Sequence, residues 1–288
     1  MDPNYRITEN PAPRVAPRVA PRVASLHIYP IKSCRGIAVD EVLLTAAGLE
    51  HDREWMVVTP EGRFVTQREV PRLALIATAL DGNALTLTAD GNGSLTVPLD
   101  HRGGETQVTV WHDRCRAFDQ GESAARWLSN LLGRAVRLVR FDPAQRRLSD
   151  KAWTGAIEAP NRFSDGFALL AISRASLADL NARLATPLPM DRFRPNLVLE
   201  GLPPYGEDLL TDLVAGEIRL RRVKPCTRCS ITTTNQATAT VEGDEPLRTL
   251  KSYRWDKALR GVTFGQNMIV VSGAGMQLRA GQAFSAGE

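Results

Sequence analysis

Short apolar runs separated by turn residues dominate the chain. Residues 25–33 (SLHIYPIKS) and 40–49 (DEVLLTAAGL) have the length and composition of strands. Two hairpins are expected next, with turns at residues 60–62 (Pro-Glu-Gly) and 81–83 (Asp-Gly-Asn). Strands this short and this evenly spaced favour a compact β barrel or sandwich.

Two segments instead have the spacing of amphipathic helices. Residues 121–132 repeat apolar side chains every three to four positions, after Glu122 and Ser123, which suit a helix start; these side chains are Ala124, Trp127, Leu128 and Leu131. In residues 173–185, Ser173 can cap a helix, and one face carries Leu177, Leu180 and Leu184.

Strand-like runs then return at residues 194–201, 217–225, 264–273 and 275–284. The pattern therefore predicts a mainly β fold with minor α, in two β-rich units of about residues 25–145 and 146–288. Residues 1–24 contain a Pro-Arg-Val-Ala repeat, and proline at every fourth position disfavours a helix. We expect residues 1–24 to be a disordered leader.

The charge balance excludes some classes of partner. The 288 residues include 36 Lys and Arg against 32 Asp and Glu, a formal charge of +4, half of which lies in the first 24 residues. No basic run is broken by aromatics, so we expect neither nucleic acid nor an anionic membrane as partner. Because no apolar stretch suits a membrane span or a signal peptide, the sequence predicts a cytoplasmic protein.

Cys226 and Cys229 form the most specific chemical signal. A structural zinc site needs four ligands, but Cys34, Cys115 and the four histidines are not paired at ligand spacing. A thioredoxin-like pair would open a helix, whereas residues 230–234 are β-branched and strand-like. Two interpretations remain: a thiolate favoured by the adjacent Arg228, which could ligate a redox metal if a cofactor supplied the other ligands, or two inert cysteines on a strand.

Three further groups carry polar side chains near expected strand ends. Lys32, Ser33 and Arg53 could form a phosphate cradle, because ammonium, hydroxyl and guanidinium groups all donate hydrogen bonds to phosphate. Residues 191–196 (DRFRPN) and 164–166 (SDG) follow as the second and third groups. Each could equally be a solvated strand end or a turn without further function.

The order of these groups resembles the MOSC family, which is similar to the C-terminal domain of molybdenum cofactor sulfurase. The resemblance covers residues 25–284. Within the family, the chain looks most like the branch of amidoxime-reducing proteins, which pair an N-terminal β-barrel domain with the MOSC domain. The resemblance rests on eight ordered motifs: YPIKSCRG, GLEHDREWMVV, FVTQREVPRLALI, FSDGFALLAISRASLADLN, DRFRPNLVLEG, KPCTRCSITTTNQATA, LRTLKSYR and FGQNM.

The resemblance implies a molybdenum cofactor with Cys229 as the metal ligand. It assigns Lys32, Ser33 and Arg53 to the cofactor phosphate. The positions that match pterin contacts are Asp165, Arg194, Asn196, Thr227 and Arg228. The catalytic candidates are Cys229 and Asn235. Asn235 stands where relatives usually have an aspartate, and an amide cannot titrate as a carboxyl group does. Ala239 stands where a glycine is common.

The implied reaction is two-electron reduction of N-hydroxylated compounds such as amidoximes, hydroxylamines and N-hydroxylated bases. Two alternatives stay open: a carrier of molybdenum cofactor or its sulfur without reductase turnover, and an interaction barrel without cofactor. The chain has no Gly-x-Gly-x-x-Gly after a strand and no four cysteines free for an iron–sulfur cluster. We therefore expect a separate electron donor, namely a ferredoxin-, flavodoxin- or cytochrome b5-like protein with its reductase.

Overall fold

The structure, a computed structural model, describes residues 20–241 and 243–287. Strands dominate it and helices are few and short, which confirms the predicted mainly β fold with minor α. The predicted leader lies largely outside the described residues. Its last part is not a leader, because strand β1 (Arg22–Ile28) begins at Arg22 and buries Val23 completely.

The largest sheet runs in the order β2-β1-β15-β14-β19-β17-β16-β21, with β18 paired to β19. Its other strands are β2 (Ile37–Val39), β14 (Leu169–Ser173), β15 (Leu197–Glu200), β16 (Asp212–Ala215), β17 (Ile218–Thr227), β18 (Trp255–Asp256), β19 (Gly261–Ser272) and β21 (Ser285–Gly287). β14 and β15 are parallel and are joined by helix α3 (Arg174–Ala182), whereas the other pairs are antiparallel.

Smaller sheets form the remainder of the fold. One has the order β5-β11-β10-β9 and another the order β6-β7-β8; β20-β3-β4 and β12-β13 complete the set. Their strands are β3 (Glu41–Thr45), β4 (Gly48–Leu49), β5 (Trp55–Val58), β6 (Ala77–Asp81), β7 (Ala84–Ala89), β8 (Gly93–Pro98), β9 (Glu105–Val110), β10 (Asp113–Asp119), β11 (Arg137–Phe141), β12 (Arg147–Leu148), β13 (Pro160–Asn161) and β20 (Gln277–Arg279).

The two predicted units exchange strands. β1 lies in the large sheet, where Leu26 faces Leu197 of β15, and β20 pairs with β3. The largest apolar core accordingly joins residues from both halves of the chain, from Val23 to Phe284. The boundary near residue 145 stays a prediction, but the chain does not divide there into two separate cores.

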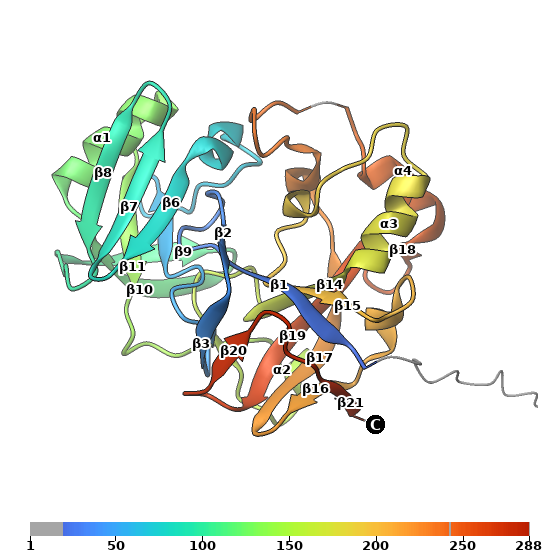
Figure 1. The fold of residues 1–288 in the computed structure, drawn as a ribbon. Coiled ribbons are helices and arrows are strands. Elements are labelled where there is room, and N and C mark those ends of the chain that lie inside the picture. Colours follow the sequence, from blue (N-terminus) through green and yellow to red (C-terminus); the bar gives the residue numbers. More distant parts are fainter. Residues whose placement is uncertain (1–19, 242, 288) are drawn as a thin grey trace, which may run out of the picture.

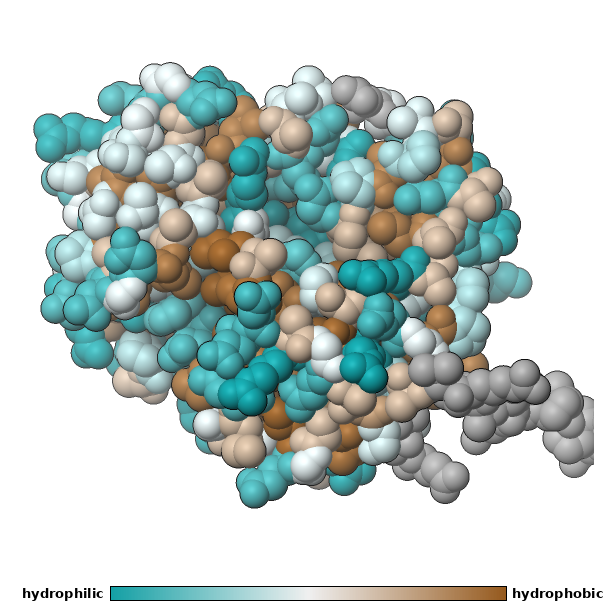
Figure 2. Space-filling model, viewed as in Figure 1, coloured by the Kyte–Doolittle hydropathy of each residue, from teal (hydrophilic) through white to brown (hydrophobic). Residues whose placement is uncertain are grey.

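Figure 1 shows β6–β8 and helix α1 (Glu122–Leu132) on one side and helices α3 and α4 (Leu247–Tyr253) on the other. The large sheet lies below and between them. On the same face of the molecule, hydrophilic residues lie in the hollow between these two parts (Figure 2). Segments far apart in sequence therefore meet around the middle of the molecule.

Both predicted amphipathic helices are present. α1 begins after Gly121 and buries Ala124, Leu128 and Leu131, as its spacing predicts. α3 begins after Ser173, whose side-chain oxygen accepts a hydrogen bond from the Ser176 N–H at 3.0 Å, so the predicted cap is confirmed. α3 ends at Ala182, three residues before the predicted end.

The remaining helical segments are α2 (Lys151–Thr154) and the 3₁₀ turns η1 (Pro71–Leu75), η2 (Met190–Arg192), η3 (Gly206–Leu209) and η4 (Ser230–Thr233). The strand-like interpretation of residues 230–234 is wrong for residues 230–233, which form η4. The hydroxyls of Thr232 and Thr233 donate to the carbonyl oxygens three residues earlier, at 2.9 and 2.8 Å. These local bonds stabilise a tight turn despite the β-branched side chains.

The two expected hairpin turns differ. Residues 82 and 83 connect β6 to β7, as predicted. The turn at residues 60–62 does not lead into a second hairpin strand. The residues after it form isolated β-bridges instead, such as Phe64 with Val58. No helix in the described part of the chain is long and apolar enough to span a membrane.

Candidate functional site

One cavity collects nearly all of the predicted site residues. The loops after β1, before β5 and before β14 and β15, together with the end of β17, converge on it. Its predicted members are Lys32, Ser33, Arg53, Asp165, Arg194, Asn196, Thr227, Arg228 and Cys229. They come from five separate segments, so only the folded chain brings them together.

Lys32 and Asp165 form an ion pair at the cavity. Lys32 Nζ donates to Asp165 Oδ1 at 2.6 Å and to the Phe163 carbonyl oxygen at 2.8 Å. Burial lowers the pKa of Lys32 despite this partner. Burial alone would raise the pKa of Asp165, but the charge and hydrogen bond of Lys32 outweigh it and the net shift is downward. Lys32 and Asp165 are therefore each other's ionic partner at the cavity.

Three hydrogen-bond acceptors from the protein hold the Arg53 guanidinium. Its Nη1 contacts the buried Asp52 carboxylate at 2.7 Å and Asn196 Oδ1 at 3.0 Å, and its Nη2 donates to the Arg194 carbonyl oxygen at 3.2 Å. Asn196 also accepts from the Leu170 N–H and donates to the His27 carbonyl oxygen. The Asn196 side chain is thus committed to protein partners and positions Arg53.

Arg194 differs from Arg53 because its charge has no carboxylate partner. In residues 20–241 and 243–287, its guanidinium has neither an ion pair nor a hydrogen-bond acceptor. It lies 4.3 Å from the ring centroid of Tyr29, as does Arg53. Burial lowers the pKa of Arg194 to about 10, so it remains a cation at neutral pH. A half-buried, uncompensated cation makes this part of the cavity suited to an anion.

Backbone strain is also concentrated here. Ser33, Arg53 and Arg194 have φ values of 68°, 46° and 56°, in the left-handed region that non-glycine residues seldom adopt. Each such residue costs on the order of 1–3 kcal/mol and persists only where its surroundings impose it. The strain supports a binding role for these loops.

The two neighbouring cysteines face different arginines. Arg228 Nη1 lies 2.9 Å from Cys226 Sγ, and its Nη2 donates to the Phe193 carbonyl oxygen at 2.8 Å. Cys229 is exposed, and Arg68 Nη1 lies 3.7 Å from its Sγ. The prediction that Arg228 assists Cys229 is therefore wrong, because the side chain of Arg228 turns toward Cys226.

Asn235 does not reach this cavity. It lies beyond η4 and lines another hollow, formed largely by residues 183–189 and the start of α4. Asn235 Oδ1 accepts from the backbone N–H groups of Ala237 and Thr238, at 3.0 and 3.3 Å. Its side chain therefore stabilises a turn, and the structure does not support a catalytic role for it.

Sequence reasoning missed Arg68 and Trp111. Arg68 lies 4.7 Å from the Trp111 ring centroid, and Trp111 Nε1 donates to Asp165 Oδ1 at 3.0 Å. Arg68 belongs to the motif FVTQREVPRLALI, which offered a signal, whereas Trp111 follows a strand without any recognisable motif. Both come from the N-terminal half of the chain, and Arg68 reaches Cys229 whereas Trp111 contacts Asp165.

Together these features define a mainly β protein with an exposed thiol at the mouth of a cation-lined cavity. The chain belongs to the MOSC family: residues 20–135 match the MOSC N-terminal beta barrel domain and residues 158–285 match the MOSC domain. The predicted family is therefore confirmed.

Curated relatives support the same family. Mitochondrial amidoxime-reducing component 1 of Mus musculus is 39% identical over 240 residues, which cover 80% of this chain and 71% of the relative. The Homo sapiens protein of the same name is 39% identical over 245 residues with the same coverage. Mitochondrial amidoxime reducing component 2 of Rattus norvegicus is 38% identical over 243 residues, 79% of this chain and 70% of that one.

Solved structures give only partial similarity. A solution structure from Bordetella bronchiseptica has a TM-score of 0.29 at 28% identity and covers 35% of this chain and 85% of that one. The crystal structure of YiiM from Geobacillus stearothermophilus has a TM-score of 0.31 at 21% identity and covers 42% of this chain and 55% of that one. Neither score supports an argument about the whole fold.

The predicted cytoplasmic location is wrong. The curated relatives are named as mitochondrial proteins, which contradicts that prediction. The prediction rested on the lack of an apolar signal core, and import into an organelle does not depend on such a core.

Proposed function

We propose that this protein is a molybdenum-cofactor-dependent reductase of N-hydroxylated compounds. In the reaction the N–O bond of the substrate is cleaved, two electrons and two protons are consumed, and the amine-level product and water leave. The observation that carries the proposal is the exposed Cys229 thiol at a cavity with uncompensated cationic groups. Relatives named for amidoxime reduction support this substrate class.

The donor groups of the cavity fit an anionic, planar cofactor. The Arg194 cation has no acidic partner in the described chain, so a phosphate would compensate it. Arg228 Nε is buried and lacks an acceptor in the same part of the chain, so a polar ring edge would satisfy it. The thiol of Cys229 is a soft ligand suited to molybdenum. The other metal ligands must come from the cofactor, because no three His, Cys, Asp or Glu side chains gather among the described residues.

The predicted site residues would hold different parts of the cofactor. Lys32, Ser33, Arg53 and Arg194 would hold the phosphate end, and Asp165, Thr227 and Arg228 would hold the pterin. Asn196 acts through Arg53, which it orients. When bound, the cofactor supplies the two-electron redox centre. The protein would orient that centre and ligate it through Cys229, whose Sγ lies beside the Arg68 guanidinium.

Electrons would come from a separate ferredoxin-, flavodoxin- or cytochrome b5-like donor with its reductase. The other two cysteines, Cys34 and Cys115, are completely buried. Burial raises the pKa of the Cys34 thiol to about 12 and also raises that of Cys115. Together they provide only two of the four thiolates that a plant-type iron–sulfur cluster needs.

The test supplies purified protein with an amidoxime and a chemically reduced dye. Amidine should form at one equivalent per two electrons consumed. The same assay with NADH or NADPH alone should give no turnover until a separate electron-transfer protein is added. Metal-replete protein that reduces no N-hydroxylated compound would contradict the proposal and favour a cofactor carrier.

A further inference from the structure

Two buried glutamines join the two matched domains beside the cofactor cavity. Gln67 lies in the match to the N-terminal domain, and Gln236 lies in the match to the MOSC domain. Only 1% and 6% of these residues are exposed. Each amide nitrogen donates to the amide oxygen of the other side chain, at 3.0 and 2.9 Å. This reciprocal pair links segments that lie 169 positions apart in the chain.

Gln67 also holds the backbone of Ser33. Its amide nitrogen donates to the Ser33 carbonyl oxygen at 2.7 Å. Ser33 is one of the strained residues of the site, with a φ of 68°. A hydrogen bond to a buried carbonyl favours the backbone conformation that makes it, because the oxygen would otherwise lack a partner. Gln67 therefore helps to keep the proposed phosphate-binding loop in its strained conformation.

Gln236 makes the corresponding bond on the other side of the pair. Its amide nitrogen donates to the Thr234 carbonyl oxygen at 3.1 Å. Thr234 follows η4, the turn that begins directly after Cys229, and its N–H donates to the Ile231 carbonyl oxygen at 3.1 Å. Gln236 therefore fixes the end of the turn whose first neighbour is the proposed metal ligand.

The segment of Gln67 reaches the cavity through both of its neighbours in sequence. Thr66 is buried and lines the cavity. Arg68 Nη1 lies 3.7 Å from Cys229 Sγ. A shift of the backbone at Gln67 would therefore change the position of Arg68 relative to Cys229 as well as the position of the Ser33 loop.

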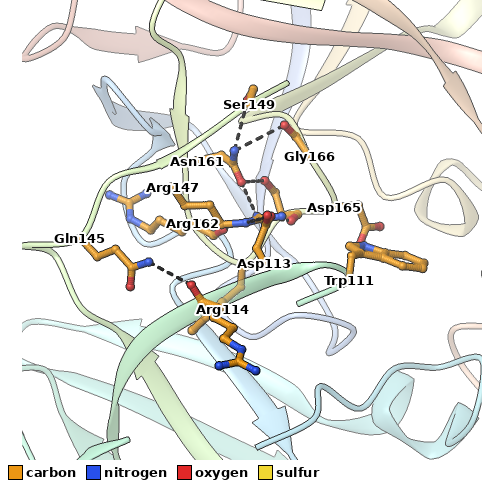
Figure 3. Close-up of polar contacts among 12 residues, drawn as sticks. Trp111, Asp113, Arg114, Gln145, Arg147, Ser149, Asn161, Arg162, Asp165 and Gly166 are labelled. Carbon is orange, nitrogen blue, oxygen red and sulfur yellow. Dashed lines mark hydrogen bonds and ion pairs between the residues drawn. The ribbon is translucent and has the colours of Figure 1, made fainter. Parts of the chain in front are cut away.

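The loop of Asp165, at another wall of the cavity, has an anchor of its own. Figure 3 shows the Arg147 guanidinium beside the backbone that leads to Asp165. Nη1 of Arg147 donates to the carbonyl oxygens of Arg162 and Ser164, each at 2.7 Å, and Arg147 is buried. Neither glutamine takes part in these contacts. The Asp165 loop is therefore an internal control for the effect of the glutamine pair.

From these contacts we infer that Gln67 and Gln236 are positioning residues that hold the Ser33 loop and the Cys229 turn in a fixed relative position for the cofactor. The loop would bind one end of the cofactor and the turn would bind the metal, so a site already aligned at both ends binds more tightly. The inference rests on the proposed function and adds two residues that lie outside the cavity lining.

The test compares Gln67→Met, Gln236→Met and the double variant with Gln120→Met. Methionine keeps the length of the side chain and removes the amide. Gln120 is a matched control because it is also buried but lies outside the cavity lining. It donates to the Phe118 carbonyl oxygen at 2.9 Å and accepts from the Trp55 indole N–H at 3.3 Å. Its variant therefore loses similar hydrogen bonds without touching the proposed pair.

The first readout is the rate at which purified protein loses molybdenum during dialysis. Gln67→Met and Gln236→Met should each lose the metal about tenfold faster than the wild type, equivalent to one hydrogen bond. Gln120→Met should lose it at the rate of the wild type. The double variant should fall well short of the product of the two single effects, about a hundredfold, because either substitution alone breaks the pair.

Hydrogen exchange of the cofactor-free chain gives a second readout that needs neither metal nor substrate. In Gln67→Met, the backbone amides of residues 31–35 and 229–235 should exchange faster than in the wild type. Those of residues 162–166 should be unchanged, because Arg147 holds that loop. A merely structural role of Gln67 would accelerate exchange in all three segments alike.

Molybdenum loss from Gln67→Met no faster than from Gln120→Met would overturn the inference, and so would faster exchange in residues 162–166 as well. Wild-type protein that carried no molybdenum would instead contradict the proposed function. In that case, faster exchange confined to residues 31–35 and 229–235 would still support the positioning pair.

Discussion

Arg228 donates a hydrogen bond to Cys226, two residues before it, rather than to Cys229, which directly follows it. Cys226 thereby anchors the guanidinium that also binds the Phe193 carbonyl oxygen. Cys229 is left exposed at the mouth of the cavity. The two cysteines of one motif therefore have separate tasks: one orients an arginine, and the other is available as a ligand.

The first prediction concerns these tasks. Cys229→Ala should abolish dye-driven reduction, because it removes the proposed protein ligand of the metal. Cys226→Ala should keep most of the activity, since Arg228 retains its bond to Phe193. Parallel kcat measurements on both variants check this, and equal losses would show that the cysteines act as a pair.

Arg194 should be important for binding and not for folding. Arg194→Gln should lower cofactor affinity by about ten- to a hundredfold, the worth of one charge-assisted hydrogen bond. The unfolding free energy of the cofactor-free protein should not fall, because the half-buried Arg194 guanidinium has no ion pair or hydrogen-bond acceptor to lose among the described residues.

Arg53→Gln is the matched control for Arg194→Gln. It leaves the buried Asp52 without its cation, so it should lower cofactor affinity and also reduce stability by about 3 kcal/mol. Cofactor retention on a desalting column and urea titration of the cofactor-free protein measure the two effects. A large stability loss in Arg194→Gln would contradict the assignment.

The turn after η4 allows a stability prediction. Ala239 has a φ of 58°, the left-handed conformation that glycine adopts without strain. Ala239→Gly should therefore raise the unfolding free energy by about 1 kcal/mol. Ala237→Gly is the control: Ala237 is exposed and has no positive φ, so glycine there should not stabilise. The same change in both variants would refute the argument.

Asn235 in the same turn should not control proton transfer. An aspartate can accept the same two backbone hydrogen bonds, so Asn235→Asp should fold normally. Since the residue lies outside the cofactor cavity, the pH–rate profiles of variant and wild type should superimpose. A new limb in the profile of the variant would place Asn235 in the chemistry after all.

Glu54 should make stability depend on pH. Burial would raise its pKa, but His51, Arg140 and Arg162 together lower it to about 2, against 4.5 for a free side chain. The charged form therefore stabilises the fold above about pH 4.5, and this contribution disappears as the pH falls toward 2. Urea titrations of wild type and Glu54→Gln should differ by about 2–3 kcal/mol at pH 7, and the difference should shrink below about pH 4.5 and vanish near pH 2. A constant difference down to pH 3 would exclude this mechanism.

The sequence predicted the residues of the cavity better than their contacts. The ordered motifs were sufficient to predict that Lys32, Arg53, Arg194 and Cys229 belong to one site, and all four line one cavity. No sequence pattern could show that Lys32 pairs with Asp165, 133 positions away, because such contacts depend on the packing of distant loops. Trp111 was missed for the same reason.

Local structure was predictable where one segment determined its own conformation. The helix α3 with its Ser173 cap is such a case, since the cap and the apolar face lie within one short run. η4 was mistaken for a strand, because threonine hydroxyls bonded to nearby carbonyl oxygens override the β preference of that side chain. The placement of β1 in the large sheet depends on a partner strand about 170 residues away, which no local pattern reveals.

Metal analysis of the purified protein tests the central claim most directly. After expression in a molybdenum-replete host, the wild type and Cys226→Ala should each carry close to one molybdenum per chain, and Cys229→Ala should carry much less. Wild-type protein without molybdenum, or a Cys229→Ala variant that retains as much of the metal as the wild type, would contradict the account.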